Sequence, residues 1–187
     1  MFGRPTTEVY RWVVTRYLRP RAAIVEAVDR FAREHFGERP MLAVHVRGTD
    51  KIAEDARLKD QYDSYPVPIG EWLLAHPEGR IFLLTDSERT HEEHRRRYPD
   101  RVVATACVRG DGPVGIHLRP RDRPDLNAVE VLVDSLLAAR CGWFMGHGMS
   151  NVSCMIQHLK DWPPDRITLT QPVLHEFINP LLYQIPR

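Results

Sequence analysis

Short apolar runs alternate with segments of helical periodicity along most of this chain. The runs have no 3.6-residue period and are bounded by proline, glycine or polar residues, which favours buried strands of a parallel sheet. The predicted strands are Met41 to Val46, Arg80 to Leu84, Arg101 to Thr105, Gly142 to Gly146 and Arg166 to Leu169. Periodicity and capping residues predict helices at 7–18, 21–35, 69–75, 88–97, 125–140 and 152–159. This alternation predicts an α/β fold, a parallel sheet with helices on both faces.

Two stretches interrupt the pattern. Residues 52–65 are polar with charges on every side, and they predict either a loop or an exposed short helix. Residues 109–123 contain three glycines and two prolines, which is typical of an irregular loop. Because no internal repeat or clear linker divides the chain, its 187 residues predict a single domain that spans 1–187.

Composition and charge narrow the range of partners. The net charge is +1, so no overall positive field attracts nucleic acid, and any anion site must be local. The three cysteines lack the spacing of a zinc site or a disulfide framework, which favours a reducing compartment. No run approaches the length of a membrane span, and the N-terminus has no signal-peptide core. These features predict a cytoplasmic protein that binds neither nucleic acid nor membrane.

Three of the predicted strands end in polar clusters. The clusters lie at residues 45–51, 85–87 and 146–151. In one parallel sheet these ends meet at the carboxyl edge, where α/β proteins bind ligands. The guanidinium of Arg47 suits two oxygens of a phosphate, and His45 could donate a further hydrogen bond. In the third cluster a Gly-x-Gly turn opens into a helix, where backbone N–H groups and the Ser150 hydroxyl suit a phosphate. The clusters therefore predict an anionic ligand.

Each of these residues also has a structural role open to it on sequence alone. Arg47 could form an ion pair with Asp50, and His45 could be a hydrogen-bonded core histidine. Ser150 could simply cap the helix that follows it. Asp134 falls beside the apolar face of its helix, an unusual place for a carboxylate, where it could cap the backbone of a nearby loop.

Three motifs, taken together, resemble the α1,6-fucosyltransferase group, which includes bacterial nodulation fucosyltransferases and the animal enzyme that core-fucosylates N-glycans. The motifs are HVRGTDK from His45 to Lys51, IFLLTDS from Ile81 to Ser87, and VLVDSLLAARCGWFMGHGMSNVS from Val131 to Ser153. They follow the family's order, and the resemblance runs from about residue 8 to about residue 160. It implies a Rossmann-like domain that binds a nucleotide sugar, one half of a GT-B glycosyltransferase.

The resemblance implies GDP-fucose as the donor and gives each matched residue a role. Arg47 would hold the β-phosphate, and His45 would contact the nucleotide. Asp86 would line the nucleotide pocket, and Asp134 would hydrogen-bond the guanine or the ribose. Ser150 and the turn at Gly148 that precedes it would bind the diphosphate.

The implied reaction inverts the anomeric carbon and needs no metal, because Arg47 neutralises the departing GDP. The spacing of the histidines gives no metal motif either. The acceptor hydroxyl needs a general base. The family's position for it is four residues after the lysine of the first motif, which here makes Asp55 the base, with Glu54 adjacent and Lys51 assisting. On the residues alone, Glu54 and Asp55 are solvated loop charges.

Two departures from the family's pattern bear on function. Gly48 stands where members of the family often have a second arginine, a departure that bears on donor affinity or sugar choice. The chain matches only the donor half, so a glycan acceptor would need a missing N-terminal domain or a second chain. Two alternatives follow: a non-catalytic module that binds a nucleotide or glycan and regulates a partner, or a transferase that uses another sugar nucleotide.

Overall fold

The computed structural model describes residues 6–48, 56–110, 123 and 125–170. In these ranges the strands form one five-stranded parallel sheet in the order β3-β2-β1-β4-β5. They are β1 (Met41–Val46), β2 (Arg80–Thr85), β3 (Val102–Val103), β4 (Trp143–Gly146) and β5 (Ile167–Leu169). All five predicted strands are present, which confirms the α/β fold. The edge strand β3 is shorter than the predicted 101–105, because only two of its residues pair with β2.

β1 is the central strand of the sheet, and later strands are added on both of its sides. β2 and β3 lie on one side of β1, after which the chain crosses over and adds β4 and β5 on the other side. The segments after β1 and after β4 leave the sheet toward opposite faces, since α4 and α5 follow β1 and α8 follows β4. Such a switch in strand order opens a crevice at the carboxyl edge.

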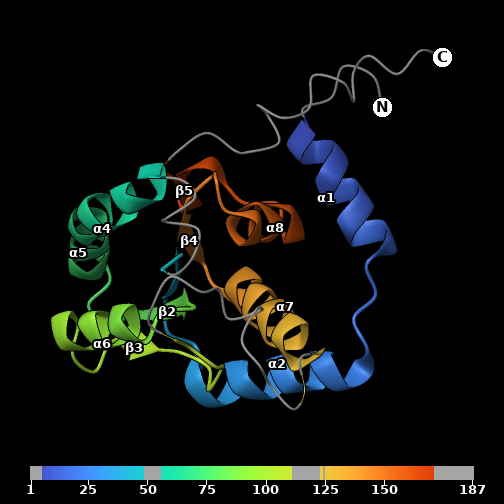
Figure 1. The fold of residues 1–187 in the computed structure, drawn as a ribbon, viewed down its shortest axis with the longest axis horizontal. Coiled ribbons are helices and arrows are strands. Elements are labelled where there is room, and N and C mark those ends of the chain that lie inside the picture. Colours follow the sequence, from blue (N-terminus) through green and yellow to red (C-terminus); the bar gives the residue numbers. More distant parts are fainter. Residues whose placement is uncertain (1–5, 49–55, 111–122, 124, 171–187) are drawn as a thin grey trace.

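Helices cover both faces of the sheet (Figure 1). One face carries α2 (Ala22–His35), α7 (Asp125–Arg140) and α8 (Asn151–Leu159), with α1 (Thr6–Tyr17) packed against α8. The other face carries α4 (Asp60–Ser64), α5 (Pro66–Ala75) and α6 (Glu88–Arg97). Short 3-10 helices cover Ala56–Lys59 and Pro164–Arg166. No helix in the described ranges is both long and apolar enough to cross a bilayer.

The helix predicted at 69–75 begins three residues earlier than expected. Pro66 and Pro68 lie in the first turn of α5, where backbone N–H groups have no partner within the helix, so proline removes no hydrogen bond. Of the ambiguous segment 52–65, residues 56–64 are helical.

Side chains of β1 alternate between two cores. Met41 and Ala43 pack with α2 and α7, whereas Val44 and Val46 pack with α4 and α5. His45 continues the first series, because side chains two residues apart on a strand share a face. Alternation therefore sends the His45 ring toward α7 and α8.

The two halves of α7 have different surroundings. Leu137 and Ala138, near its C-terminal end, are fully buried in the core. Val131 lies seven residues before Ala138, on the same side of the helix, yet its exposed fraction is 49% and it lines the pocket. The C-terminal half of α7 packs on the sheet, and the N-terminal half is left to form the wall of a pocket.

Candidate functional site

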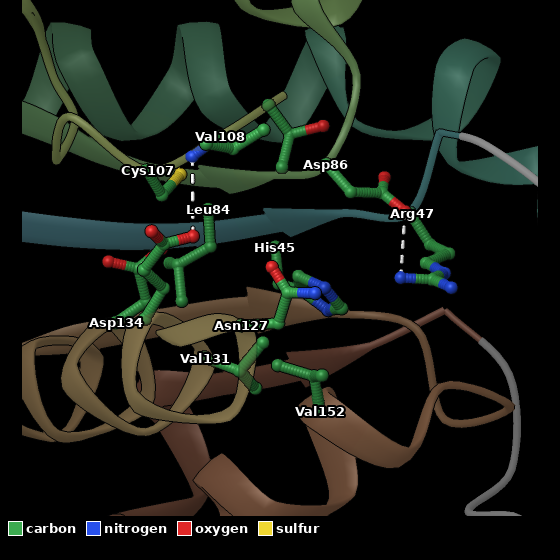
Figure 2. Close-up of a pocket in the computed structure, with 12 residues that line it drawn as sticks. His45, Arg47, Leu84, Asp86, Cys107, Val108, Asn127, Val131, Asp134 and Val152 are labelled. Atoms are coloured by element: carbon green, nitrogen blue, oxygen red, sulfur yellow. Dashed lines mark hydrogen bonds and ion pairs between the residues drawn. The ribbon is translucent and has the colours of Figure 1, made fainter. Parts of the chain in front are cut away.

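A pocket lies at the carboxyl ends of β1 and β2, in the crevice beside the switch in strand order (Figure 2). The strand ends contribute His45, Arg47, Thr85 and Asp86. The facing wall is α7, which contributes Asn127, Glu130, Val131 and Asp134. Figure 2 shows Arg47 and Asp134 at opposite ends of this pocket. Two of the three predicted polar clusters thus meet at one rim.

The carboxylate of Asp86, at the end of β2, binds two groups at the end of β1. Oδ2 of Asp86 lies 2.7 Å from Nη1 of Arg47, and Oδ1 accepts a 2.8 Å hydrogen bond from the backbone N–H of Gly48. The Arg47 and Asp86 side chains are only 19% and 14% exposed, so water screens this ion pair little. Sequence alone allowed a pair between Arg47 and Asp50, but Asp50 lies outside the described residues, and the ion pair seen is with Asp86.

His45 is buried at the end of β1, where the alternation along the strand places it. Its Nδ1 lies 2.8 Å from Oγ of Ser153, and that oxygen also accepts a hydrogen bond from the backbone N–H of His147. Burial lowers the pKa of His45 to about 4; Asp86 opposes this shift, and Arg47 and His147 add to it. The ring is therefore neutral near pH 7, and because Ser153 occupies Nδ1, a ligand could reach only Nε2.

Asp134 places a carboxylate at the far end of the pocket. Its Oδ1 accepts a 2.7 Å hydrogen bond from Oγ1 of Thr105. Burial raises the pKa of Asp134 from 3.8 to about 6; the hydrogen bond from Thr105 and the charge of Arg109 oppose this shift, and Glu130 adds to it. At neutral pH the carboxylate is ionised and suited to accept hydrogen bonds from the N–H groups of a ligand.

The cluster after β4 is arranged differently. Gly148 and Ser150 are not among the residues that line the pocket, although Val152 in the first turn of α8 is. Ser150 is the N-cap residue of α8, but its hydroxyl makes no capping hydrogen bond. A Cβ atom at Gly146 would lie 2.6 Å from Oγ of Ser153, so the first glycine of the Gly-x-Gly turn serves packing. The diphosphate role of Gly148 and Ser150 stays a prediction.

Three predicted catalytic residues, Lys51, Glu54 and Asp55, lie outside the described residues, and their roles stay predictions. Arg47 is the predicted catalytic residue that the structure places, and it lies in the pocket. Within the described ranges, no three His, Cys, Asp or Glu side chains are grouped as ligands of a metal ion would be.

Asn127 and Glu130 line the pocket without having been predicted, although their spacing from the predicted Asp134 is a signal in the sequence. Asn127, Glu130 and Asp134 are spaced i, i+3 and i+7, which places them on one face of a helix. Cys107 and Val108 carry no such signal, because they lie in an irregular segment after β3.

Gln61 of α4 is a further contact that sequence reasoning could not find. Its Oε1 accepts a 2.9 Å hydrogen bond from the backbone N–H of Arg47, and its Nε2 donates to the backbone carbonyl of Arg47. A side chain that bonds to backbone leaves no pattern of residue types, because the partner residue can be of any type.

Gly48 packs so closely against the start of α6 that there is no room for a side chain. A Cβ atom there would lie 2.4 Å from Cβ of Ser87 and 3.2 Å from Oγ1 of Thr90. A second arginine at this position, as in the family's pattern, would have to displace the start of α6.

We expect Gly48→Ala to lower the free energy of unfolding by about 1–3 kcal/mol, the usual cost of overpacking. Thermal denaturation measures the effect. Gly70→Ala is the matched control, because nothing lies within 4 Å of its added Cβ in α5, and alanine favours a helix there. An unchanged melting temperature for Gly48→Ala would show that the loop yields without cost.

The side chains that line the pocket indicate the chemistry of the ligand that it suits. A guanidinium stands at one end and a carboxylate at the other, and apolar Leu84, Val131 and Val152 lie among the lining residues. An elongated molecule suits it, with an anionic group near Arg47 and N–H donors near Asp134.

Comparison with known proteins gives one curated relative and several solved structures. No protein-family model matches the sequence. The Alpha-(1,6)-fucosyltransferase of Drosophila melanogaster is 33% identical over an alignment 87 residues long, which covers 44% of this chain and 14% of that protein.

Solved structures share the fold. Fucosyltransferase NodZ from Bradyrhizobium matches with a TM-score of 0.54 at 21% identity, over 79% of this chain and 44% of that chain. NodZ alpha-1,6-fucosyltransferase soaked with GDP-fucose matches with a TM-score of 0.57 at 22% identity, over 84% and 48%. The same enzyme co-crystallised with GDP gives a TM-score of 0.53 at 19% identity. The chain spans less than half of each of these proteins.

Proposed function

We propose that this chain, which resembles the α1,6-fucosyltransferases in sequence and in fold, is the donor-binding half of a GT-B glycosyltransferase that uses GDP-fucose. The observation that carries the proposal is the pocket at the switch in strand order, with Arg47 and Asp134 at its two ends. A solved structure with this fold has been soaked with GDP-fucose, and another was co-crystallised with GDP.

In this proposal the nucleotide lies along the pocket. Arg47 binds the β-phosphate, and Asp134 accepts hydrogen bonds from the guanine or the ribose, with Asn127 and Glu130 on the same helix face. Nε2 of His45 contacts the nucleotide, since Ser153 holds the other ring nitrogen. Asp86 acts through Arg47, because its two oxygens hold the guanidinium and the next backbone N–H.

The proposed reaction is an inverting displacement at the anomeric carbon of fucose. The acceptor hydroxyl attacks and GDP departs, while Arg47 stabilises the negative charge that develops on the diphosphate. The general base is Asp55 or the adjacent Glu54, and Lys51 assists it. The half of the enzyme that binds the glycan acceptor belongs to a preceding segment or to a second chain.

Thermal denaturation with nucleotides tests the donor site. GDP at about a hundred times its Kd should add about 2.7 kcal/mol to the free energy of unfolding, which raises the melting temperature by several degrees. UDP and ADP at equal concentrations should give smaller shifts. An unchanged melting curve with millimolar GDP would overturn the proposal, and a larger shift with UDP or ADP would indicate another sugar nucleotide.

A second candidate function is a non-catalytic module that binds a nucleotide and regulates a partner. It shares the pocket and the nucleotide contacts with the first candidate, and it differs in that no reaction follows binding. This candidate predicts GDP binding without transfer or hydrolysis of GDP-fucose. Release of GDP from GDP-fucose in the presence of candidate glycan acceptors would rule it out.

A further inference from the structure

The backbone ladder of β1 ends just before Arg47. The last residues paired between β1 and β2 are Val46 and Thr85, so the peptide groups of Arg47 lie beyond the sheet. A strand that continued would find one acceptor for its N–H and one donor for its carbonyl on a neighbouring strand. Here no further strand residue of β2 supplies them.

The side chain of Gln61 supplies both. Its Oε1 accepts from the Arg47 N–H at 2.9 Å, and its Nε2 donates to the Arg47 carbonyl. Gln61 is 1% exposed, so water does not compete with these bonds. A carboxamide has one acceptor and one donor group in the same plane, as a peptide group has, and so it extends the ladder by one residue.

Arg47 is thereby held from two directions. Gln61 fixes its backbone from α4, and Asp86 fixes its guanidinium from the end of β2. An arginine side chain loses rotamer entropy when it is ordered, so an arginine that is fixed before binding gives up less of it on contact with an anion.

We infer that Gln61 is a positioning residue for the phosphate-binding Arg47, an inference that rests on the proposed function. Gln61 is not among the residues that line the pocket. It sets the direction in which the Arg47 side chain leaves β1, and therefore acts on the part of the ligand that Arg47 contacts.

A comparison of GDP with GMP tests this role, because GMP lacks the β-phosphate. Calorimetric titration of the full chain should show that Gln61→Met weakens GDP binding about tenfold, as loss of a supporting partner commonly does. GMP affinity should stay within about twofold. A purely structural role for Gln61 would weaken both nucleotides equally, and that result would overturn the inference.

Two control variants test whether the change in affinity is specific to the loss of Gln61. Gln157→Met removes a carboxamide from α8, outside the pocket lining, and should leave both affinities unchanged. Ile69→Val removes one buried methyl group from the core beside β1, and should lower the melting temperature while the GDP-to-GMP ratio persists.

A second variant keeps the test decisive if Gln61→Met does not fold. Gln61→Glu has the same shape but cannot donate to the Arg47 carbonyl at neutral pH, and it too should lose GDP affinity selectively. If the ratio of GDP affinity to GMP affinity is the same in this variant as in the unaltered chain, the inference about Gln61 is overturned while the proposed function stands. An unaltered chain that binds neither nucleotide would overturn the proposed function as well.

Discussion

Arg47→Ala should abolish the rise in melting temperature that millimolar GDP gives the unaltered chain. The guanidinium lines the pocket and is fixed by Asp86 at 2.7 Å, so it meets an anion with little reorganisation. Hydrogen bonds to charged groups contribute about 1.5–3 kcal/mol each, and loss of a bidentate pair should weaken GDP binding about a hundredfold or more. The difference in melting temperature with and without GDP is the measurement.

The basal melting temperature should also fall, because Asp86 is mostly buried and loses its charged partner. Arg89→Ala is the matched control: Arg89 pairs with Glu93 on α6, is 81% exposed and lies outside the pocket lining. That variant should keep the full response to GDP. Arg47→Lys keeps the charge but loses the planar fork, so its response should be intermediate. A full GDP response in Arg47→Ala would place the phosphate elsewhere.

Strand ends were the part of the site that the sequence could predict. Parallel strands bring their carboxyl ends to one edge, so the positions of Arg47 after β1 and Asp86 after β2 imply that the two lie together. Their 2.7 Å ion pair confirms this. Asp134 could also be singled out from the sequence, because a carboxylate beside the apolar face of a helix is unusual. The structure places it in the lining of the pocket.

Contacts between a side chain and backbone could not be predicted in this way. Gln61 bonds to peptide groups, which every residue has, so no pairing of residue types marks it. The exposed Val131 of α7 shows a related limit. Periodicity identifies an apolar face, but it does not tell whether that face meets the core or a pocket.

Asp134→Asn should raise stability and lower affinity for the nucleotide. Burial raises the pKa of Asp134 to about 6, so the folded chain holds this proton more tightly than the unfolded chain does. The stabilisation is fully present below about pH 4 and is lost as the pH rises through about 6. At pH 7.5 the ionised carboxylate therefore destabilises the fold, and removing its charge should add about 1–2 kcal/mol, allowing for screening at the pocket mouth.

Binding of the donor should change in the opposite direction, because the carboxylate is the proposed acceptor for N–H groups of the guanine. Asparagine keeps one acceptor oxygen for Thr105 but loses the charge, so affinity should fall about tenfold or more. In the unaltered chain, affinity should also fall below about pH 6, where Asp134 takes up its proton. His45 does not titrate in that window, since its pKa is about 4.

GDP-fucose is the ligand for this pH series, because the terminal phosphate of GDP itself titrates at about pH 6. Asp29→Asn is the control: it removes a surface carboxylate that pairs with Arg140, and should leave affinity and its pH dependence unchanged. A higher melting temperature of Asp134→Asn, together with weaker binding that no longer depends on pH, would show that Asp134 contacts the ligand. Misfolding could not give this result, because it lowers both stability and affinity. A lower melting temperature with unchanged affinity would instead make Asp134 a structural acceptor for Thr105.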